Sequence, residues 1–383
     1  MNMSLSEEDI LNDIVTTRNL SKRSYNSYKT SINSYQEYME TPLWELIEEA
    51  ESEEETGIRW KFRKLKKRLI EYRAYLYSNY SPQTARTYFG RICSVYRHFE
   101  IEIHDLPKFS ERKIDNEPIN FSDLPDKDVI RQSLQIATPI LRAIILFIVS
   151  SGCARAETMS LTIQDLLDSV SEYYQTDNVY DMIKELRYRK DIIPIFKLKR
   201  QKTNKYYYTF CTPEAFHAIC DYILSIKKTV KSTDKLFQLN PDRLITNFRT
   251  INNVLHLGLV GKHGRFRTHM LRKYNASQLY NDGLPIEDID ALQGRGKSKT
   301  HQSYFMEDPK KLKEKYIAHM DCLLINTNVI KFNIKSSEYK QMEEDLLMKQ
   351  NEVDELNSRM DDLEKLVLGG ISEERLSRLM KYL

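Results

Sequence analysis

Three side chains between residues 266 and 305 could act together on a phosphate ester. His269 and Arg272 are three residues apart in a predicted helix, so both side chains share one face. Tyr304 follows in a polar, basic stretch. A guanidinium matches phosphate oxygens with a rigid fork of donors, and a phenol oxygen can attack phosphorus once a base accepts its proton. These residue types therefore fit phosphoryl transfer through a covalent phosphotyrosine.

Further polar residues in the same half of the chain suit the same reaction. Arg155 and Glu157 follow a predicted buried helix and a glycine turn, and Arg155 could instead pair with Glu157 or with a neighbouring helix. Lys202 is expected at the tip of a hairpin, where it could protonate a leaving alkoxide. Arg295 follows a glycine, nine residues before Tyr304. No carboxylate cluster is offered, so the pattern does not imply metal catalysis.

The elements that must position these residues are mostly helical. Apolar periodicity predicts helices over residues 126–136 and 139–152, the second of them buried. Residues 191–212 are rich in Ile, Phe and Tyr on both sides of a polar centre, which predicts a β-hairpin with its turn near Thr203 and Asn204. Helical patterns return after the hairpin, over residues 213–228, 242–257, 267–283 and 285–294.

The N-terminal part predicts a separate helical bundle with a basic face. Ser21 and Ser81 are expected to cap helices, with Pro82 at a first helical position. The acidic stretch 45–55 reads as a solvated loop or a helix end. One helix has an apolar face, and five basic residues beside it are candidates for contacts with DNA phosphates: Arg63, Lys64, Lys66, Lys67 and Arg68.

The whole chain is therefore expected to be mainly α-helical with a small antiparallel β-sheet, followed by a C-terminal coiled-coil helix. Heptads after residue 336 predict the coiled coil, which either pairs protomers or packs back on its own body. We assign a flexible N-terminus, a helical DNA-binding domain, a linker, a catalytic domain and a C-terminal extension. These cover residues 1–19, 20–104, 105–121, 122–320 and 321–383.

Composition narrows the function classes. Residues 335–383 hold 12 acidic and 8 basic side chains, a net of −4, so the rest of the chain carries about +7, which favours a polyanionic partner. The five cysteines lack metal-ligand spacing and are expected to be reduced. Neither a membrane span nor a signal peptide is predicted, so we expect a cytoplasmic protein. The phosphate-loop, zinc-protease and serine-hydrolase motifs are all missing from the sequence.

Four segments together resemble the tyrosine recombinases, the phage integrase family, over about residues 20 to 320. They appear in the order that this family uses for its arginine, lysine, histidine-x-x-arginine and tyrosine. The segments are "SGCARAETMSLT" with Arg155, "RQKTNKYYYTF" with Lys202, "THMLRKYNASQLYNDG" with His269 and Arg272, and "LQGRGKSKTHQSYF" with Arg295 and Tyr304.

Two positions depart from the pattern of that family. Aligned without a gap on Gly152 and Glu157, the first arginine of the family falls on Ala154, so Arg155 lies one residue late. One helical residue is about 100° of rotation, and Arg155 reaches the phosphate only if its helix starts differently. Arg295 stands where the family usually has histidine or tryptophan; it can donate to phosphate but cannot act as an acid or base.

The resemblance implies that Arg155, Arg272 and Arg295 hold the scissile phosphate. It further implies that Tyr304 attacks to give a 3′-phosphotyrosine, with His269 accepting its proton. Lys202 would protonate the leaving 5′ oxygen.

The implied protein is a site-specific DNA recombinase that binds double-stranded DNA. It would act as a homo-oligomer, a tetramer in synapsis, and need no cofactor, metal or ATP. Two alternatives remain open. One is a catalytically impaired DNA-binding protein of the same fold, favoured by the displaced Arg155. The other is a relaxing enzyme like the type IB topoisomerases.

Overall fold

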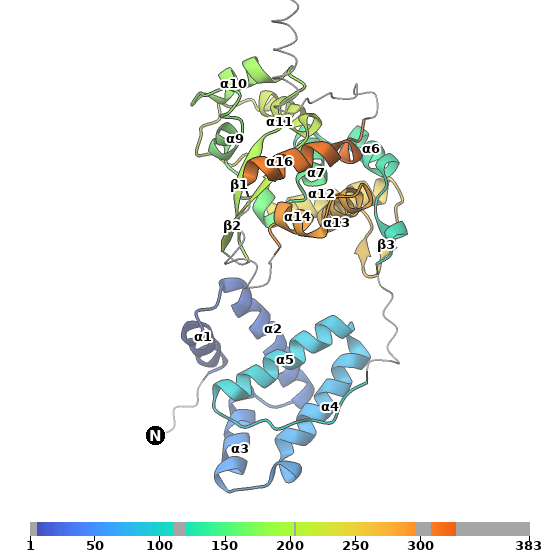
Figure 1. The fold of residues 1–383 in the computed structure, drawn as a ribbon. Coiled ribbons are helices and arrows are strands. Elements are labelled where there is room, and N and C mark those ends of the chain that lie inside the picture. The colour runs from blue at the N-terminus through green and yellow to red at the C-terminus, as the bar shows by residue number, and fades with distance from the viewer. Residues whose placement is uncertain (1–5, 111–118, 203, 296–307, 327–383) are drawn as a thin grey trace, which may run out of the picture. The chain divides into compact units, whose positions relative to one another are not determined.

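The chain divides into two compact units, Met1–Pro118 (unit 1) and Ile119–Leu383 (unit 2), in a computed structural model (Figure 1). The structure describes residues 6–110, 119–202, 204–295 and 308–326. Its fold is mainly helical, with two small antiparallel sheets, which confirms the expected class. The predicted coiled coil after residue 336 lies outside the described residues. Each unit has its own core and is treated separately.

Unit 1 is a bundle of helices around a core rich in tyrosine. The rings of Tyr35, Tyr72 and Tyr96 are completely buried, and the Tyr35 and Tyr96 hydroxyls lie 3.0 Å apart. Ser21 and Ser81 cap their helices through their side chains, as predicted. The elements are α1 (Glu7–Thr17), α2 (Lys22–Met39), α3 (Leu43–Glu55), η1 (Trp60–Phe62), α4 (Lys64–Asn79) and α5 (Pro82–His98).

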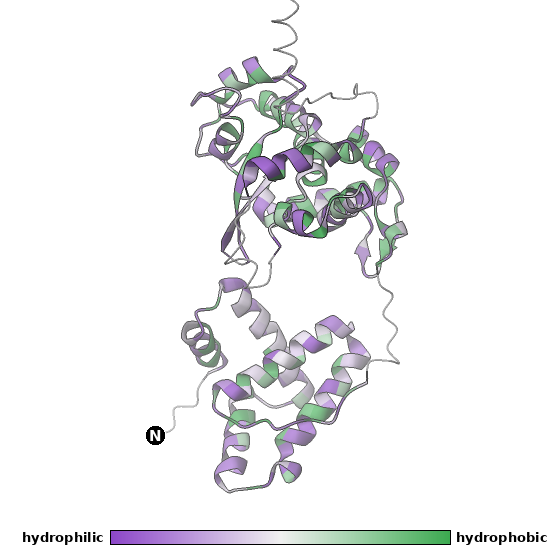
Figure 2. Cartoon of the chain, in the orientation of Figure 1, coloured by the Kyte–Doolittle hydropathy of each residue, from purple (hydrophilic) through white to green (hydrophobic). Residues whose placement is uncertain are grey.

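Two expectations for unit 1 were wrong. Residues 7–17 do not belong to a flexible N-terminus, because α1 starts with a capping box at Ser6 and buries Ile10, Leu11 and Ile14. The acidic stretch 45–55 is not a loop but most of α3. Figure 2 shows hydrophilic and hydrophobic residues alternating around these helices, so each has an apolar side to bury.

Unit 2 is built around helix α7. Every residue of this helix from Ala143 to its end at Ser151 is buried. Helices α11 and α13 pack against α7. The elements before the long hairpin are η2 (Phe121–Asp123), α6 (Lys127–Ile136), α7 (Pro139–Ser151), α8 (Arg155–Thr158), α9 (Ile163–Ser169) and α10 (Val179–Leu186). Those after it are α11 (Pro213–Ser225), α12 (Pro241–Val254), β3 (Leu259–Val260), β4 (His263–Gly264), α13 (Thr268–Asn281), α14 (Ile286–Leu292), α16 (Pro309–His319) and η3 (Met320–Leu323).

The predicted hairpin is confirmed. Strand β1 (Ile195–Arg200) pairs antiparallel with β2 (Lys205–Phe210), in a register that joins Ile195 to Phe210 and Arg200 to Lys205. Alternate residues of β1 are buried, so one face lies on the core and the other carries lysines to the surface. Asn204 closes the turn with a φ of 58°, in the left-handed region that asparagine tolerates.

Among the helices that the structure describes, none is long and apolar enough to cross a membrane.

Candidate functional site

Arg272 is at the centre of the candidate site, in the second turn of α13. Its side chain is only 8% exposed. Nη1 donates to the carbonyl oxygen of Gly152 at 2.5 Å, and Nη2 donates to that of Gln293 at 2.7 Å. Burial lowers the pKa of Arg272, but arginine starts so high that it stays charged. The guanidinium therefore ties the end of α7 to the end of α14 and keeps other N–H donors for a ligand.

Two buried amide side chains, those of Gln293 and Asn275, form a hydrogen-bonded cluster with the backbone of Arg272. Gln293 Nε2 donates to the Arg272 carbonyl at 3.2 Å and to Asn275 Oδ1 at 2.8 Å. Asn275 Nδ2 in turn donates to the carbonyls of Val149 and Ser150 at 2.9 and 3.0 Å. Neither amide was predicted as part of the site. The partners of Asn275 on α7 are more than 100 residues away, and those of Gln293 lie in another helix, so no local pattern indicates these contacts.

Gly152 provides the first stability prediction. It has a φ of 64°, and a Cβ there would lie 2.3 Å from Asn275 Oδ1 and 2.7 Å from Gln293 Nε2. Gly152→Ala is expected to lower the free energy of unfolding by about 2–4 kcal/mol, from backbone strain plus overpacking. Urea unfolding followed by circular dichroism measures this loss.

The matched control is Gly258→Ala in the same unit. Gly258 also has a positive φ, 75°, but a Cβ there would meet nothing within 4 Å. The loss of stability in Gly258→Ala therefore measures the backbone strain without overpacking. Equal urea midpoints for the two variants would contradict the role given to the amide cluster.

His269 lies at the exposed end of α13, surrounded by cations. Neighbouring atoms shield its ring from water, which lowers its pKa below the usual 6.5. The charges of Lys273, Arg267, Arg272 and Arg295 lower the pKa further. At neutral pH the imidazole is therefore neutral and can accept a proton.

Arg295 stands just beyond the end of α14, at the surface. Its guanidinium is 41% exposed, and Nη1 lies 3.2 Å from Asp290 Oδ1. The backbone N–H of Arg295 donates to the Asp290 carbonyl at 2.7 Å, which closes the last turn. An exposed ion pair of this kind is weak, so a phosphate could compete with Asp290 for the guanidinium.

Arg155 opens a new helix instead of continuing α7. Gly152 ends α7 in the left-handed region, and Ala154 is extended with a ψ of 154°. The expected alternative, a salt bridge to Glu157, is not seen: within the described residues the Arg155 side chain has no hydrogen bond or ion pair. Glu157 is 5% exposed, and its Oε2 has no partner there either. The guanidinium of Arg155 is thus not engaged by the described part of the chain.

Lys202 is exposed in the turn between β1 and β2. The two residues before it attach the hairpin tip to other segments. Arg200 Nη1 donates to the Gly294 carbonyl, and Gln201 Nε2 is 3.5 Å from the Ala156 carbonyl. One contact reaches the residue before Arg295, and the other reaches the first turn of α8.

These contacts bring four separate segments of unit 2 into one neighbourhood. Arg272 contacts the ends of α7 and α14, and the hairpin tip contacts α8 and the turn after α14. The segments carry five of the predicted residues: Arg155, Lys202, His269, Arg272 and Arg295. Tyr304 lies outside the described residues, nine positions after Arg295. The chemical roles of all six stay predictions.

The five basic residues predicted to contact DNA differ in how they are used within unit 1. Arg63 is 8% exposed, with Nη1 3.2 Å from Glu54 Oε2, and Arg68 pairs with Glu49. The acidic side chains of α3 therefore neutralise part of the basic face. Lys64 also pairs with Glu49 and Lys67 with Glu71, but these two lysines remain 66% and 80% exposed. Lys66 is half-buried.

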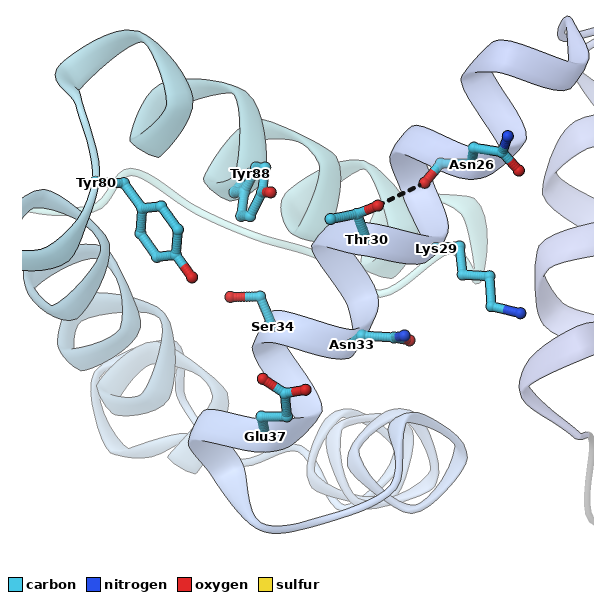
Figure 3. A pocket seen from close by; sticks show the side chains of 8 residues that line it. All are labelled: Asn26, Lys29, Thr30, Asn33, Ser34, Glu37, Tyr80 and Tyr88. Carbon is cyan, nitrogen blue, oxygen red and sulfur yellow. Dashed lines mark hydrogen bonds between the residues drawn. The ribbon is translucent and has the colours of Figure 1, made fainter. Parts of the chain in front are cut away.

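Unit 1 also holds a polar pocket of about 500 Å³ (Figure 3). Six of its residues come from one side of α2, where Thr30 Oγ1 donates to the Asn26 carbonyl at 2.8 Å. Tyr80, directly after α4, and Tyr88, within α5, face them. The lining is Asn26, Lys29, Thr30, Asn33, Ser34, Glu37, Tyr80 and Tyr88. None of the predicted catalytic residues is among them.

No family model matches the sequence, and neither does any curated protein. Among solved structures, a lambda integrase dimer bound to a COC′ core site matches with a TM-score of 0.50 at 13% identity, covering 80% of this chain and 78% of that one. XerH recombinase bound to a palindromic difH substrate gives 0.49 at 17% identity, covering 81% and 83%. The chain has the fold of the tyrosine recombinases and integrases.

Proposed function

We propose that this protein is a site-specific DNA strand transferase that cuts and rejoins DNA through a 3′-phosphotyrosine. The observation that carries the proposal is the attachment of Arg272 between the ends of α7 and α14, with the β1–β2 tip fastened to both neighbouring segments. The segments that these contacts join carry one histidine, one lysine and three arginines of the predicted set, which supports the proposal. Preorganised cations of this kind stabilise charge that develops on phosphorus oxygens.

The proposed cleavage step balances without an added reactant. The Tyr304 oxygen forms a bond to phosphorus as the bond from phosphorus to the 5′ oxygen breaks. The tyrosine proton passes to His269, which is neutral at pH 7, and a proton from Lys202 goes to the leaving 5′ oxygen. Attack by a 5′-hydroxyl from another strand reverses these transfers and releases the tyrosine. Because the phosphodiester energy is kept in the protein–DNA bond, we expect no need for ATP or metal.

The proposed partner is double-stranded DNA, with the protein acting as a homo-oligomer. Structures with the same fold contain DNA, as in the lambda integrase dimer on its core site. In this chain we expect Lys64, Lys66 and Lys67 of the basic face to contact backbone phosphates. Lys64 and Lys67 are largely exposed, so their ion pairs with acids are weak and a phosphate can compete for them. Arg63 and Arg68 are more buried against their acidic partners. Such contacts should weaken steeply with salt.

Covalent trapping tests the proposed function. Purified protein is mixed with labelled DNA from the regions flanking its gene, in EDTA, then quenched with SDS and resolved on a gel. A shifted band that survives SDS and disappears with protease is expected. Salt-sensitive binding without such a band, on intact and nicked substrates, would instead favour the non-cutting DNA binder. Relaxation of supercoiled plasmid without strand exchange would favour the relaxing enzyme.

The lowered pKa of His269 predicts a pH profile for the cleavage step. The neutral imidazole is the active form, so the single-turnover rate should rise tenfold per pH unit at low pH and reach half its maximum below pH 6.5. Loss of this limb is expected in His269→Gln. His263→Gln, which alters an exposed histidine of β4, should keep it. A half-maximal rate above pH 7 would show that another group accepts the proton.

A further inference from the structure

Arg200 is the last residue of β1, and it has no part in the proposed chemical step. Its side chain is half-buried, and Nη1 donates to the carbonyl oxygen of Gly294. Gly294 directly precedes Arg295, a proposed phosphate ligand. A hydrogen bond from a charged guanidinium is about twice as strong as one between neutral groups. The contact therefore fixes the hairpin against the turn that follows α14.

The turn itself has little freedom. Gly294 has a φ of 60°, and a Cβ at this position would lie 2.6 Å from the Tyr207 ring, so the backbone rests on that ring. The preceding carbonyl, of Gln293, accepts from Arg272 Nη2 at 2.7 Å. Two consecutive carbonyls are thus held by two arginines, one from α13 and one from the hairpin. The direction in which the chain leaves the turn is set by both.

We propose that Arg200 is a positioning residue for strand cleavage. It holds the turn at Gly294 so that Arg295 keeps a fixed place beside Arg272. It touches neither the phosphate nor the reacting atoms in this account. The inference rests on the proposed function and adds a residue that the sequence pattern did not single out.

Two substitutions and one control test the proposal. Arg200→Met removes the donor, and Arg200→Lys keeps the charge and can offer one N–H to the carbonyl. Lys199→Met removes a neighbouring charge from the exposed face of the same strand. With nicked DNA under single-turnover conditions, Arg200→Met should form the covalent complex about 10- to 100-fold more slowly, the scale of a misplaced reacting group. DNA affinity should not change, Arg200→Lys should recover part of the rate, and Lys199→Met should keep it.

A sulfur substrate separates this role from an effect on Lys202. When the 5′ bridging oxygen is replaced by sulfur, the leaving group no longer needs a proton. Arg200→Met should remain slow on this DNA, because the turn and not the acid is displaced. Full recovery of the rate would overturn the proposal, since Arg200 would then act only through the hairpin lysine. A wild-type rate for Arg200→Met on ordinary DNA would overturn it as well.

Hydrogen exchange provides a readout that does not depend on activity. The amides of Gln293, Gly294 and Arg295 donate to carbonyls of α14 in the present structure. They should exchange faster in Arg200→Met, whereas Lys199→Met should leave them unchanged. If the wild-type protein itself forms no covalent complex, the proposed function fails and the role in cleavage fails with it, and exchange then tests only whether Arg200 holds the turn at Gly294. Unchanged exchange in Arg200→Met would then reject it.

Discussion

Tyr304→Phe is expected to abolish the SDS-resistant protein–DNA complex while DNA binding persists. Phenylalanine lacks the oxygen that would form the bond to phosphorus, and loss of a nucleophile costs at least about 10⁴-fold in related two-step reactions. The measurement is the covalent fraction on labelled nicked DNA, beside a gel-shift titration of the same samples. The gel shift should be unaltered, because the change removes one hydroxyl and no positive charge.

The matched control for Tyr304→Phe is Tyr280→Phe, which makes the same chemical change at a tyrosine that is 57% exposed on α13. Its covalent yield should equal that of the wild-type protein. A covalent band that persists in Tyr304→Phe would assign the nucleophile to another residue. A band lost equally in both variants would point to a general effect on the unit.

Arg272→Lys is expected to have the second largest effect. A lysine has no fork, so it cannot join the Gly152 and Gln293 carbonyls and also offer a bidentate contact to phosphate. Loss of one donor to a developing oxyanion costs about 10²–10³-fold, so the single-turnover rate should fall by at least that factor. Leaving a buried carbonyl without its donor should also lower the free energy of unfolding by about 1–3 kcal/mol.

Arg142→Lys is the matched control for Arg272→Lys. Arg142 donates from Nε and Nη2 to the Leu134 carbonyl, also within unit 2, and has no proposed part in catalysis. Cleavage rates are compared at urea concentrations where both variants are folded, so that a loss of stability is not mistaken for a loss of catalytic rate. Cleavage at the wild-type rate by Arg272→Lys, or an equal fall in Arg142→Lys, would contradict the role of Arg272.

Local patterns in the sequence predicted the features that depend on neighbouring residues alone, such as where a helix starts and which face of a strand is buried. The serine caps and Pro82 mark helix starts because side-chain hydroxyls satisfy the first free N–H groups. The alternation of apolar and polar residues in β1 predicted which face of the hairpin would be buried. The sequence did not predict α3 as a helix, because its many acidic residues outnumber the apolar side formed by Leu43, Leu46 and Ile47.

The contacts that organise the candidate site could not be predicted in the same way. Asn275 and Gln293 are ordinary amides in sequence, and their importance comes from carbonyls on distant segments. Arg200 reaches a carbonyl 94 residues away. For Arg155 the sequence showed only part of the answer. Its one-residue offset is visible in the sequence, but only the structure shows that α7 ends at Gly152 and that a new helix begins at Arg155.

The identity of the residue bonded to DNA is the most direct test of a phosphotyrosine intermediate. The trapped complex is digested with nuclease and trypsin, and the peptide that carries a nucleotide is sequenced by mass spectrometry. We predict residues 300–310, "THQSYFMEDPK", in which Tyr304 is the sole tyrosine, with the nucleotide on that side chain. A nucleotide on any other residue, or a trapped complex without a tyrosine linkage, would contradict it.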